Sequence, residues 1–147
     1  MTRLNFAHVA LNCRNLAATE RFYIELLGFE RGRVIDLGAT RIVFLRLGDV
    51  RLELFQAELS TDRPDETADG PPGVGVRHLA FQTDDADAVL KRLEGHAALN
   101  LGPLDFGGFI PGWRSAWLTD PDGRVIEISQ GYRDEASTLS LTQETTV

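Results

Sequence analysis

The sequence contains very little cysteine and no long apolar run. Its single cysteine, Cys13, has no partner within the chain, so no intrachain disulfide supports the fold and a reducing environment is expected. No segment approaches the roughly 18 consecutive apolar residues that a membrane-spanning helix needs, and the first residues lack the apolar run of a signal peptide. We therefore expect a cytoplasmic protein that does not bind membranes.

Basic residues are also scarce. The 147 residues include 15 Lys and Arg against 22 Asp and Glu, and the formal net charge is −7 at pH 7. No cluster of positive charge is present that would bind phosphate backbones, which argues against nucleic acid as a partner and leaves small molecules. Hydrophobic residues make up 43% of the chain, enough for one globular core. We expect a single domain over residues 1–133 and a mobile tail over residues 134–147.

An internal repeat divides the chain. The segment His8-Val-Ala-Leu returns as His78-Leu-Ala-Phe, and Leu-Glu53-Leu returns as Ile-Glu127-Ile. The histidine and the glutamate are 45 positions apart in the first copy and 49 in the second, a difference that loops tolerate. The repeat predicts two copies of one supersecondary unit, at about residues 4–58 and 76–131, joined by a solvated connector at residues 60–75.

Each copy has the same predicted order of elements, namely a strand, a helix and three further strands. Asn15 and Asp84 are the expected helix N-caps, and Gly28 is expected to end the first helix. The fold class is therefore α+β, with two βαβββ modules. In the first copy the strands are expected at residues 6–11, 30–37, 40–47 and 50–57, and the helix at 16–27. In the second copy the strands are expected at residues 76–82, 97–104, 114–119 and 124–130, and the helix at 85–94.

Two histidines and two glutamates occupy equivalent positions in the repeat. Because side chains alternate along a strand, all four fall on the face opposite the aliphatic residues that meet the helices. A single strand histidine or glutamate is ordinarily a core or surface residue, but four in equivalent positions favour a shared ligand. Imidazole and carboxylate groups together are typical ligands of divalent metals. We predict that the following residues bind one ion: His8, Glu53, His78 and Glu127.

Together with Asp120-Pro-Asp-Gly before the last strand, these motifs make residues 4–131 resemble the vicinal oxygen chelate superfamily. The superfamily includes glyoxalase I, bleomycin-resistance proteins and extradiol dioxygenases. The resemblance implies that the two modules form a curled, open-barrel mixed sheet with helices on the outside. It implies one Ni, Zn, Co, Mn or Fe ion, which substrates chelate through adjacent oxygens. It also implies a homodimer, and it leaves open whether each site is built within one chain or across two.

The ligand set is similar to that of glyoxalase I. This implies lyase or isomerase chemistry, in which a proton moves next to a carbonyl that the metal polarises, with Glu127 or Glu53 as the base. An Fe(II) ring-cleaving dioxygenase and a non-catalytic drug-binding protein of the bleomycin-resistance type are the alternatives. Glyoxalase I has an Arg and an Asn where this chain has Asn12 and Ala57. We therefore expect a small oxygenated metabolite as substrate rather than a glutathione conjugate.

A segment rich in glycine and aromatic residues, at residues 106–114, precedes the seventh predicted strand. Such a segment is typical of a substrate lid or of an ordinary surface loop. We predict that its aromatic residues and its arginine contact the substrate, namely Phe106, Phe109, Trp113 and Arg114. Cys13 has no partner motif and is expected to be a packed, unreactive thiol.

Overall fold

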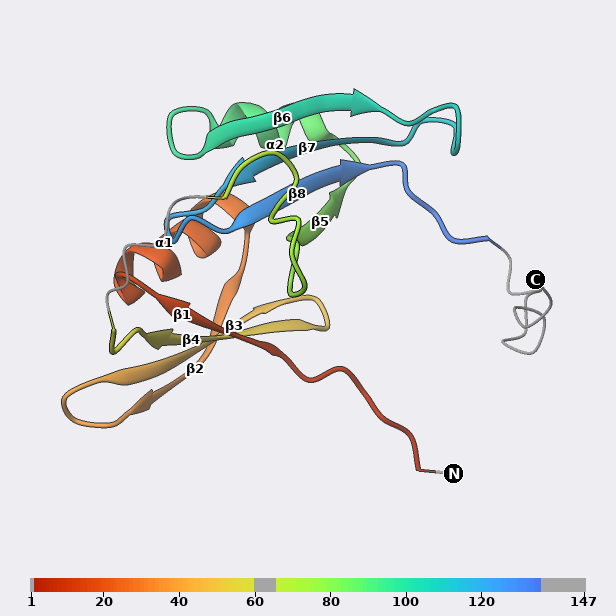
Figure 1. Cartoon of the computed structure of the whole chain (residues 1–147). Coiled ribbons are helices and arrows are strands. Elements are labelled where there is room, and N and C mark those ends of the chain that lie inside the picture. Colours follow the sequence, from red (N-terminus) through yellow and green to blue (C-terminus); the bar gives the residue numbers. More distant parts are fainter. Residues whose placement is uncertain (1, 60–65, 136–147) are drawn as a thin grey trace.

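The computed structural model describes residues 2–59 and 66–135, which form two similar modules (Figure 1). The first module contains β1 (Val9–Cys13), α1 (Leu16–Leu27), β2 (Glu30–Asp36), β3 (Arg41–Leu47) and β4 (Val50–Gln56). The second contains β5 (Leu79–Thr83), α2 (Ala86–Leu93), β6 (Ala98–Asp105), β7 (Arg114–Thr119) and β8 (Val125–Gln130). The predicted α+β class and the two βαβββ modules are confirmed.

The strands form two four-stranded sheets with the same topology. Their orders are β1-β4-β3-β2 and β5-β8-β7-β6. In each sheet the first strand of the module runs parallel to the last, and the other neighbours are antiparallel. The repeat seen in the sequence is therefore a repeat of hydrogen-bonding pattern, so equivalent positions can be compared directly between the modules.

The helices begin where side chains can satisfy their first backbone N–H groups. The Asn15 side chain accepts a hydrogen bond from the Ala18 N–H, and Gly28 ends α1 with φ of 79°, a left-handed conformation that suits glycine. For α2 the predicted cap, Asp84, is wrong. Asp85 caps this helix, because its side chain reaches the Ala88 N–H three residues on, at 2.9 Å.

Strands β1 and β5 begin later than the sequence predicts. The first ladder pairs are Val9 with Leu52 and Leu79 with Ile126, so the chain before these positions has no partner in the sheet. The N-terminal segment leads away from the body of the molecule (Figure 1). His8 and His78 therefore lie directly before their strands rather than inside them.

The core lies between the helices and the aliphatic face of each sheet. Helix α1 packs on β3 and β4, and α2 packs on β5 and β8. The aromatic ring of Tyr23 in α1 contacts Phe29 and, across the module boundary, Phe81, with ring centroids 5.6 and 6.3 Å apart. The modules thus dock through their helix sides, and the opposite sheet faces remain for a site. Among the described residues, no helix is long and apolar enough to span a membrane.

The connector lies partly against the second module. Residues 60–65 and 136–147, which include most of the predicted tail, fall outside the described residues. After them, the Glu66 N–H donates to the Gly123 carbonyl at 3.1 Å, and the Asp69 carbonyl contacts the His78 ring. The described part of the predicted solvated connector is exposed or half-buried, and its backbone also supplies hydrogen bonds to the second module.

Candidate metal centre

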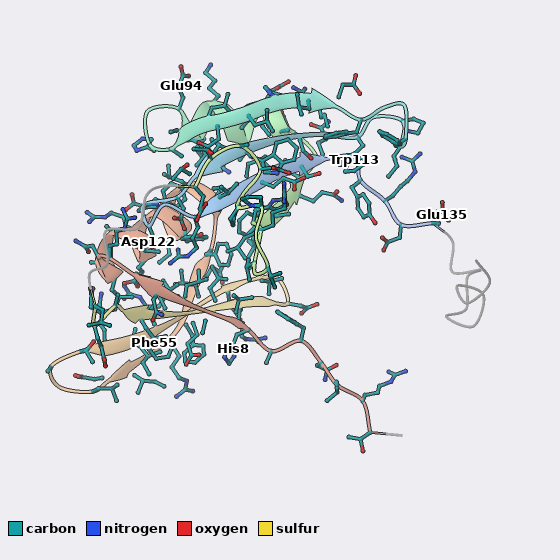
Figure 2. The ribbon with its side chains drawn as sticks, viewed as in Figure 1. His8, Phe55, Glu94, Trp113, Asp122 and Glu135 are labelled. Atoms are coloured by element: carbon teal, nitrogen blue, oxygen red, sulfur yellow. The ribbon has the colours of Figure 1, made fainter. Side chains whose placement is uncertain are left out.

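Each module brings its own histidine and glutamate together. In the first module His8 Nε2 lies 3.0 Å from Glu53 Oε2, and in the second His78 Nε2 lies 2.7 Å from Glu127 Oε2. The pairing follows from the parallel ladder, because the residue before the first strand lies beside the last strand of the module. Figure 2 shows His8 at the sheet of the first module.

An aromatic side chain borders each pair. Phe44 is the cross-strand partner of Glu53, and its ring meets His8 edge to face at 5.8 Å between centroids. Trp117 is the cross-strand partner of Glu127 and meets the second histidine in the same way, at 6.2 Å. The two modules therefore carry matching sets of histidine, glutamate and aromatic ring.

The two pairs do not meet within one chain. The described residues contain no group of three or more His, Cys, Asp or Glu side chains that could hold a metal ion. The structure therefore places each histidine beside its own glutamate, while metal binding by these residues stays a prediction. The separation of the pairs follows from the docking of the modules, which joins them through their helix sides and through Tyr23 rather than through the faces that carry the pairs.

The second pair is more buried and better supported than the first. The side chains of His78 and Glu127 are 21% and 11% exposed, against 39% and 16% for His8 and Glu53. His78 Nδ1 lies 2.6 Å from the Asp69 carbonyl oxygen, which can only accept a hydrogen bond. The Nδ1 atom therefore carries the proton. In the neutral ring the Nε2 lone pair then faces the glutamate, as it does in histidines that bind metals.

Sequence reasoning missed two serines that lie beside Glu127. Ser115 Oγ donates a hydrogen bond to Glu127 Oε1 at 2.6 Å, and Ser129 Oγ lies 3.0 Å from Ser115 Oγ. The period of two along β7 and β8 places both serines on the same face as the glutamate. That alternation is the signal by which they could have been found.

Aromatic rings extend from the predicted lid segment to the second pair. The rings of Phe106 and Trp113 are 4.7 Å apart, and Trp113 also contacts Tyr132 at 5.7 Å. Phe106 meets Trp117 edge to face at 6.2 Å, and Trp117 in turn contacts His78. Two of the predicted substrate residues, Phe106 and Trp113, thus border the site.

The other two predicted substrate residues are not brought to the pair. Phe109 is 82% exposed at the tip of the loop. Arg114 donates two hydrogen bonds of 2.9 Å to Asp87 of α2, on the helix side of the sheet. Its neighbour Ser115 faces Glu127, so the alternation of the strand turns the arginine away from the site.

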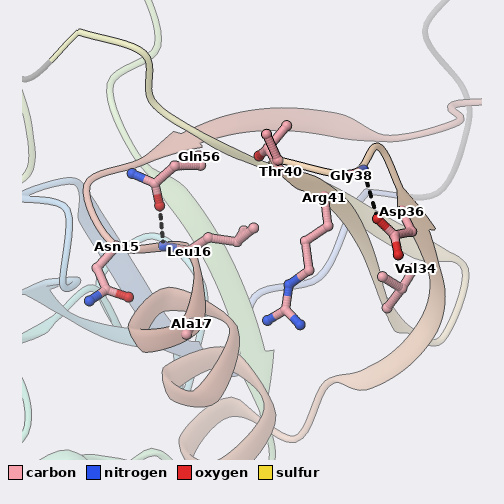
Figure 3. A pocket seen from close by; sticks show the side chains of 10 residues that line it. Asn15, Leu16, Ala17, Val34, Asp36, Gly38, Thr40, Arg41 and Gln56 are labelled. Carbon is pink, nitrogen blue, oxygen red and sulfur yellow. Dashed lines mark hydrogen bonds between the residues drawn. The ribbon is translucent and has the colours of Figure 1, made fainter.

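The surface has two hollows, and only one of them reaches a predicted metal ligand. One, of about 730 Å³, lies between β1 and the chain before β5, and His78, Asn12 and Ala57 line part of it. The other, of about 510 Å³, lies at the start of α1, where Asn15 and Arg41 are among the lining residues (Figure 3). The second hollow contains none of the four predicted metal ligands.

Comparison with known proteins relates the chain to a large superfamily. Residues 5–128 match the model of the Glyoxalase/Bleomycin resistance protein/Dioxygenase superfamily. The chain is 28% identical over 128 residues to the uncharacterized protein YaeR of Escherichia coli, which covers 82% of this chain and 92% of YaeR. It is 32% identical to a glyoxalase family protein from Enterococcus faecalis, with a TM-score of 0.66 over 85% of this chain and 96% of that one. A glyoxalase/dioxygenase from Nostoc punctiforme is 25% identical, with a TM-score of 0.67 over 86% and 90%.

Proposed function

Because this chain belongs to the Glyoxalase/Bleomycin resistance protein/Dioxygenase superfamily, we propose that it is a divalent-metal-dependent enzyme of the lyase or isomerase type. Its reaction moves a proton at a carbon next to a carbonyl of a small oxygenated metabolite. The observation that carries the proposal is the orientation of His78. Its Nδ1 proton is engaged by the Asp69 carbonyl, and its Nε2 lies 2.7 Å from a carboxylate oxygen of Glu127.

The donor atoms fit a divalent ion. With the proton of a neutral His78 ring on Nδ1, the Nε2 lone pair faces a carboxylate oxygen of Glu127, and a divalent cation between the two atoms would accept both as ligands. Ligand atoms about 2.0–2.2 Å from one ion and at right angles are about 3 Å apart. The observed separations of 3.0 and 2.7 Å agree with adjacent ligands of this kind. The residues that would hold the ion are His8, Glu53, His78 and Glu127.

The carboxylates and the aromatic rings supply the remaining chemistry. The ion, when bound, polarises a substrate oxygen and stabilises the negative charge that develops there. Glu53 and Glu127 are the bases able to accept the proton from the adjacent carbon and return it. Phe106 and Trp113 border the second pair and offer an apolar surface that would exclude water from a small substrate.

A second copy of the chain completes the proposed site. Because the pairs do not meet within the described part of one chain, His8 and Glu53 of one protomer would join His78 and Glu127 of another. The face of the first module is open enough for such a partner, since every residue of β2 is exposed. We therefore propose a homodimer with two equivalent sites.

Metal analysis tests the proposal. Protein purified without chelator, and protein loaded in turn with Ni²⁺, Zn²⁺, Co²⁺, Mn²⁺ and Fe²⁺, is expected to retain one ion per chain. The variant carrying both His8→Ala and His78→Ala is expected to retain none while keeping its circular dichroism spectrum. Wild-type protein that takes up no ion under any of these conditions would overturn the proposal. Oxygen consumption by the Fe²⁺-loaded protein with a panel of catechols would instead indicate a ring-cleaving dioxygenase.

A further inference from the structure

A chain of hydrogen bonds leads from the aromatic segment to Glu127. Trp113 Nε1 donates to Ser129 Oγ at 3.2 Å, the two serine oxygens are 3.0 Å apart, and Ser115 Oγ lies 2.6 Å from Glu127 Oε1. Both serines and Glu127 itself are buried, since Ser115, Ser129 and Glu127 are 1%, 6% and 9% exposed. Such a buried series of hydrogen bonds is sheltered from exchange with water and holds its side chains in one geometry.

The number of hydroxyl protons available fixes which group donates in each of these hydrogen bonds. An ionised carboxylate only accepts, so the single hydroxyl proton of Ser115 is donated to Glu127. Ser115 Oγ must then accept from the Ser129 hydroxyl, which in turn accepts from the Trp113 indole N–H. Every donor has one acceptor, and this series of hydrogen bonds ends at Oε1 of Glu127. The other carboxylate oxygen, Oε2, is thereby turned toward His78.

The first module lacks this support at the equivalent positions. Glu53 is paired across the strands with Phe44, just as Glu127 is paired with Trp117. The next pair on the same face is Ser115 and Ser129 in the second module. In the first module the equivalent pair is Ile42 and Phe55. Both of these are apolar. Within the described residues, His8 is the only polar side chain that contacts the Glu53 carboxylate. The repeat therefore contains an internal comparison between one supported and one unsupported carboxylate.

From this difference we infer that Ser115 is a positioning residue, which with Ser129 holds Glu127 in place as the fixed carboxylate ligand of the metal site. The inference rests on the proposed function. The second module is then the preorganised half of the site, because the Asp69 carbonyl orients His78 and Ser115 orients Glu127. Glu53 is left as the carboxylate that can rotate. Removing such an outer partner of a metal ligand typically lowers metal affinity about 10- to 100-fold.

Calorimetric titration of the full chain with Ni²⁺ tests the inference. Ser115→Ala is expected to weaken Ni²⁺ binding by about 10- to 100-fold. Ile42→Ala removes the equivalent side chain of the first module and is expected to leave the affinity within about threefold of wild type. Ser129→Ala breaks the contact between the two serine hydroxyls and is expected to weaken binding in the same direction, so the inference can be tested even if Ser115→Ala is too unstable to measure.

A spectroscopic measurement separates positioning from a structural role. The visible absorption spectrum of the Co²⁺-loaded protein is expected to change in Ser115→Ala, because the orientation of the carboxylate ligand changes, while thermal unfolding of the apoprotein stays close to wild type. If wild type binds Ni²⁺ and both Ser115→Ala and Ser129→Ala bind it equally well with unchanged Co²⁺ spectra, this inference is wrong and the proposed function stands. If wild type binds no metal at all, both fail.

Discussion

The Tyr23 hydroxyl in α1 donates a hydrogen bond of 2.8 Å to Asp120 in the turn between β7 and β8, and so joins the two modules. Both residues are buried, at 0% and 4% exposure. The Arg124 guanidinium donates to Asp120 at 2.7 Å and to Asp122 at 3.1 Å, and it also donates to the Asn12 carbonyl of the first module. The Asp-Pro-Asp-Gly turn therefore anchors the second module on the first.

Removing the anchoring carboxylate is expected to destabilise the fold strongly. Asp120→Ala leaves the Tyr23 hydroxyl and part of the Arg124 charge without their partner, which costs about 3–5 kcal/mol when a buried pair is broken. Asp87→Ala is the matched control. It breaks the exposed pair with Arg114 and is expected to cost at most about 1 kcal/mol. Urea unfolding measures both values, and equal losses would contradict the anchoring role.

Stability is expected to fall in alkaline solution because of Tyr23. Burial of the hydroxyl, reinforced by the negative charge of Asp120, raises its pKa well above the ordinary value of 10.0. Above pH of about 10 the tyrosine hydroxyl ionises in the unfolded chain but not in the folded protein. The stabilising contribution of the Tyr23 hydroxyl is therefore complete below that pH and is lost progressively above it. The free energy of unfolding, measured between pH 8 and 11, is expected to fall more steeply in wild type than in Tyr23→Phe. Parallel curves would contradict this.

Cys13 is expected to be unreactive in the folded protein. Burial, together with the negative charge of Asp122, raises the pKa of its thiol from 9.0 to about 11. The side chain is 0% exposed, so the thiol is both protonated at neutral pH and inaccessible. A thiol reagent such as dithionitrobenzoate at pH 8 is expected to titrate one thiol per chain in urea and none in buffer. Rapid labelling of the native protein would show that the site opens.

Light scattering is expected to give twice the chain mass of 16.3 kDa at micromolar concentration. Mixing the single variants His8→Ala and His78→Ala tests how the sites are built. If each site combines two chains, a heterodimer of the two variants contains one intact set of ligands, so unfolding and refolding them together restores Ni²⁺ binding that neither has alone. A monomer by light scattering, or no restoration on mixing, would contradict the shared site.

A glutathione conjugate is not the expected substrate. Asn12 and Ala57 stand where glyoxalase I carries an Arg and an Asn, so the charge-assisted contact to a glutathione carboxylate is missing. Both residues line the hollow of about 730 Å³ beside His78. Metal-loaded protein given methylglyoxal and glutathione is expected to form no thioester with kcat/KM at or above about 10⁴ M⁻¹s⁻¹. Turnover at that level would make the protein an ordinary glyoxalase I.

The sequence was sufficient for features that depend on local pattern. Helix α1 begins and ends at the predicted residues, since the Asn15 side chain and the conformational freedom of Gly28 act within one helical turn. The order of the strands follows from alternating polarity and glycine turns. The pairing of each histidine with its glutamate also follows, because a repeated pattern at matched spacing gives the same ladder twice.

Only the tertiary structure decided how these parts meet. The separation of the two His–Glu pairs depends on the docking of α1 and Tyr23 against the second module, which no local pattern encodes. The direction of Arg114 toward Asp87 depends on which face of β7 the helix covers. The support of Glu127 by Ser115 depends on cross-strand register, because two residues 12 positions apart in sequence become neighbours only when β7 pairs with β8.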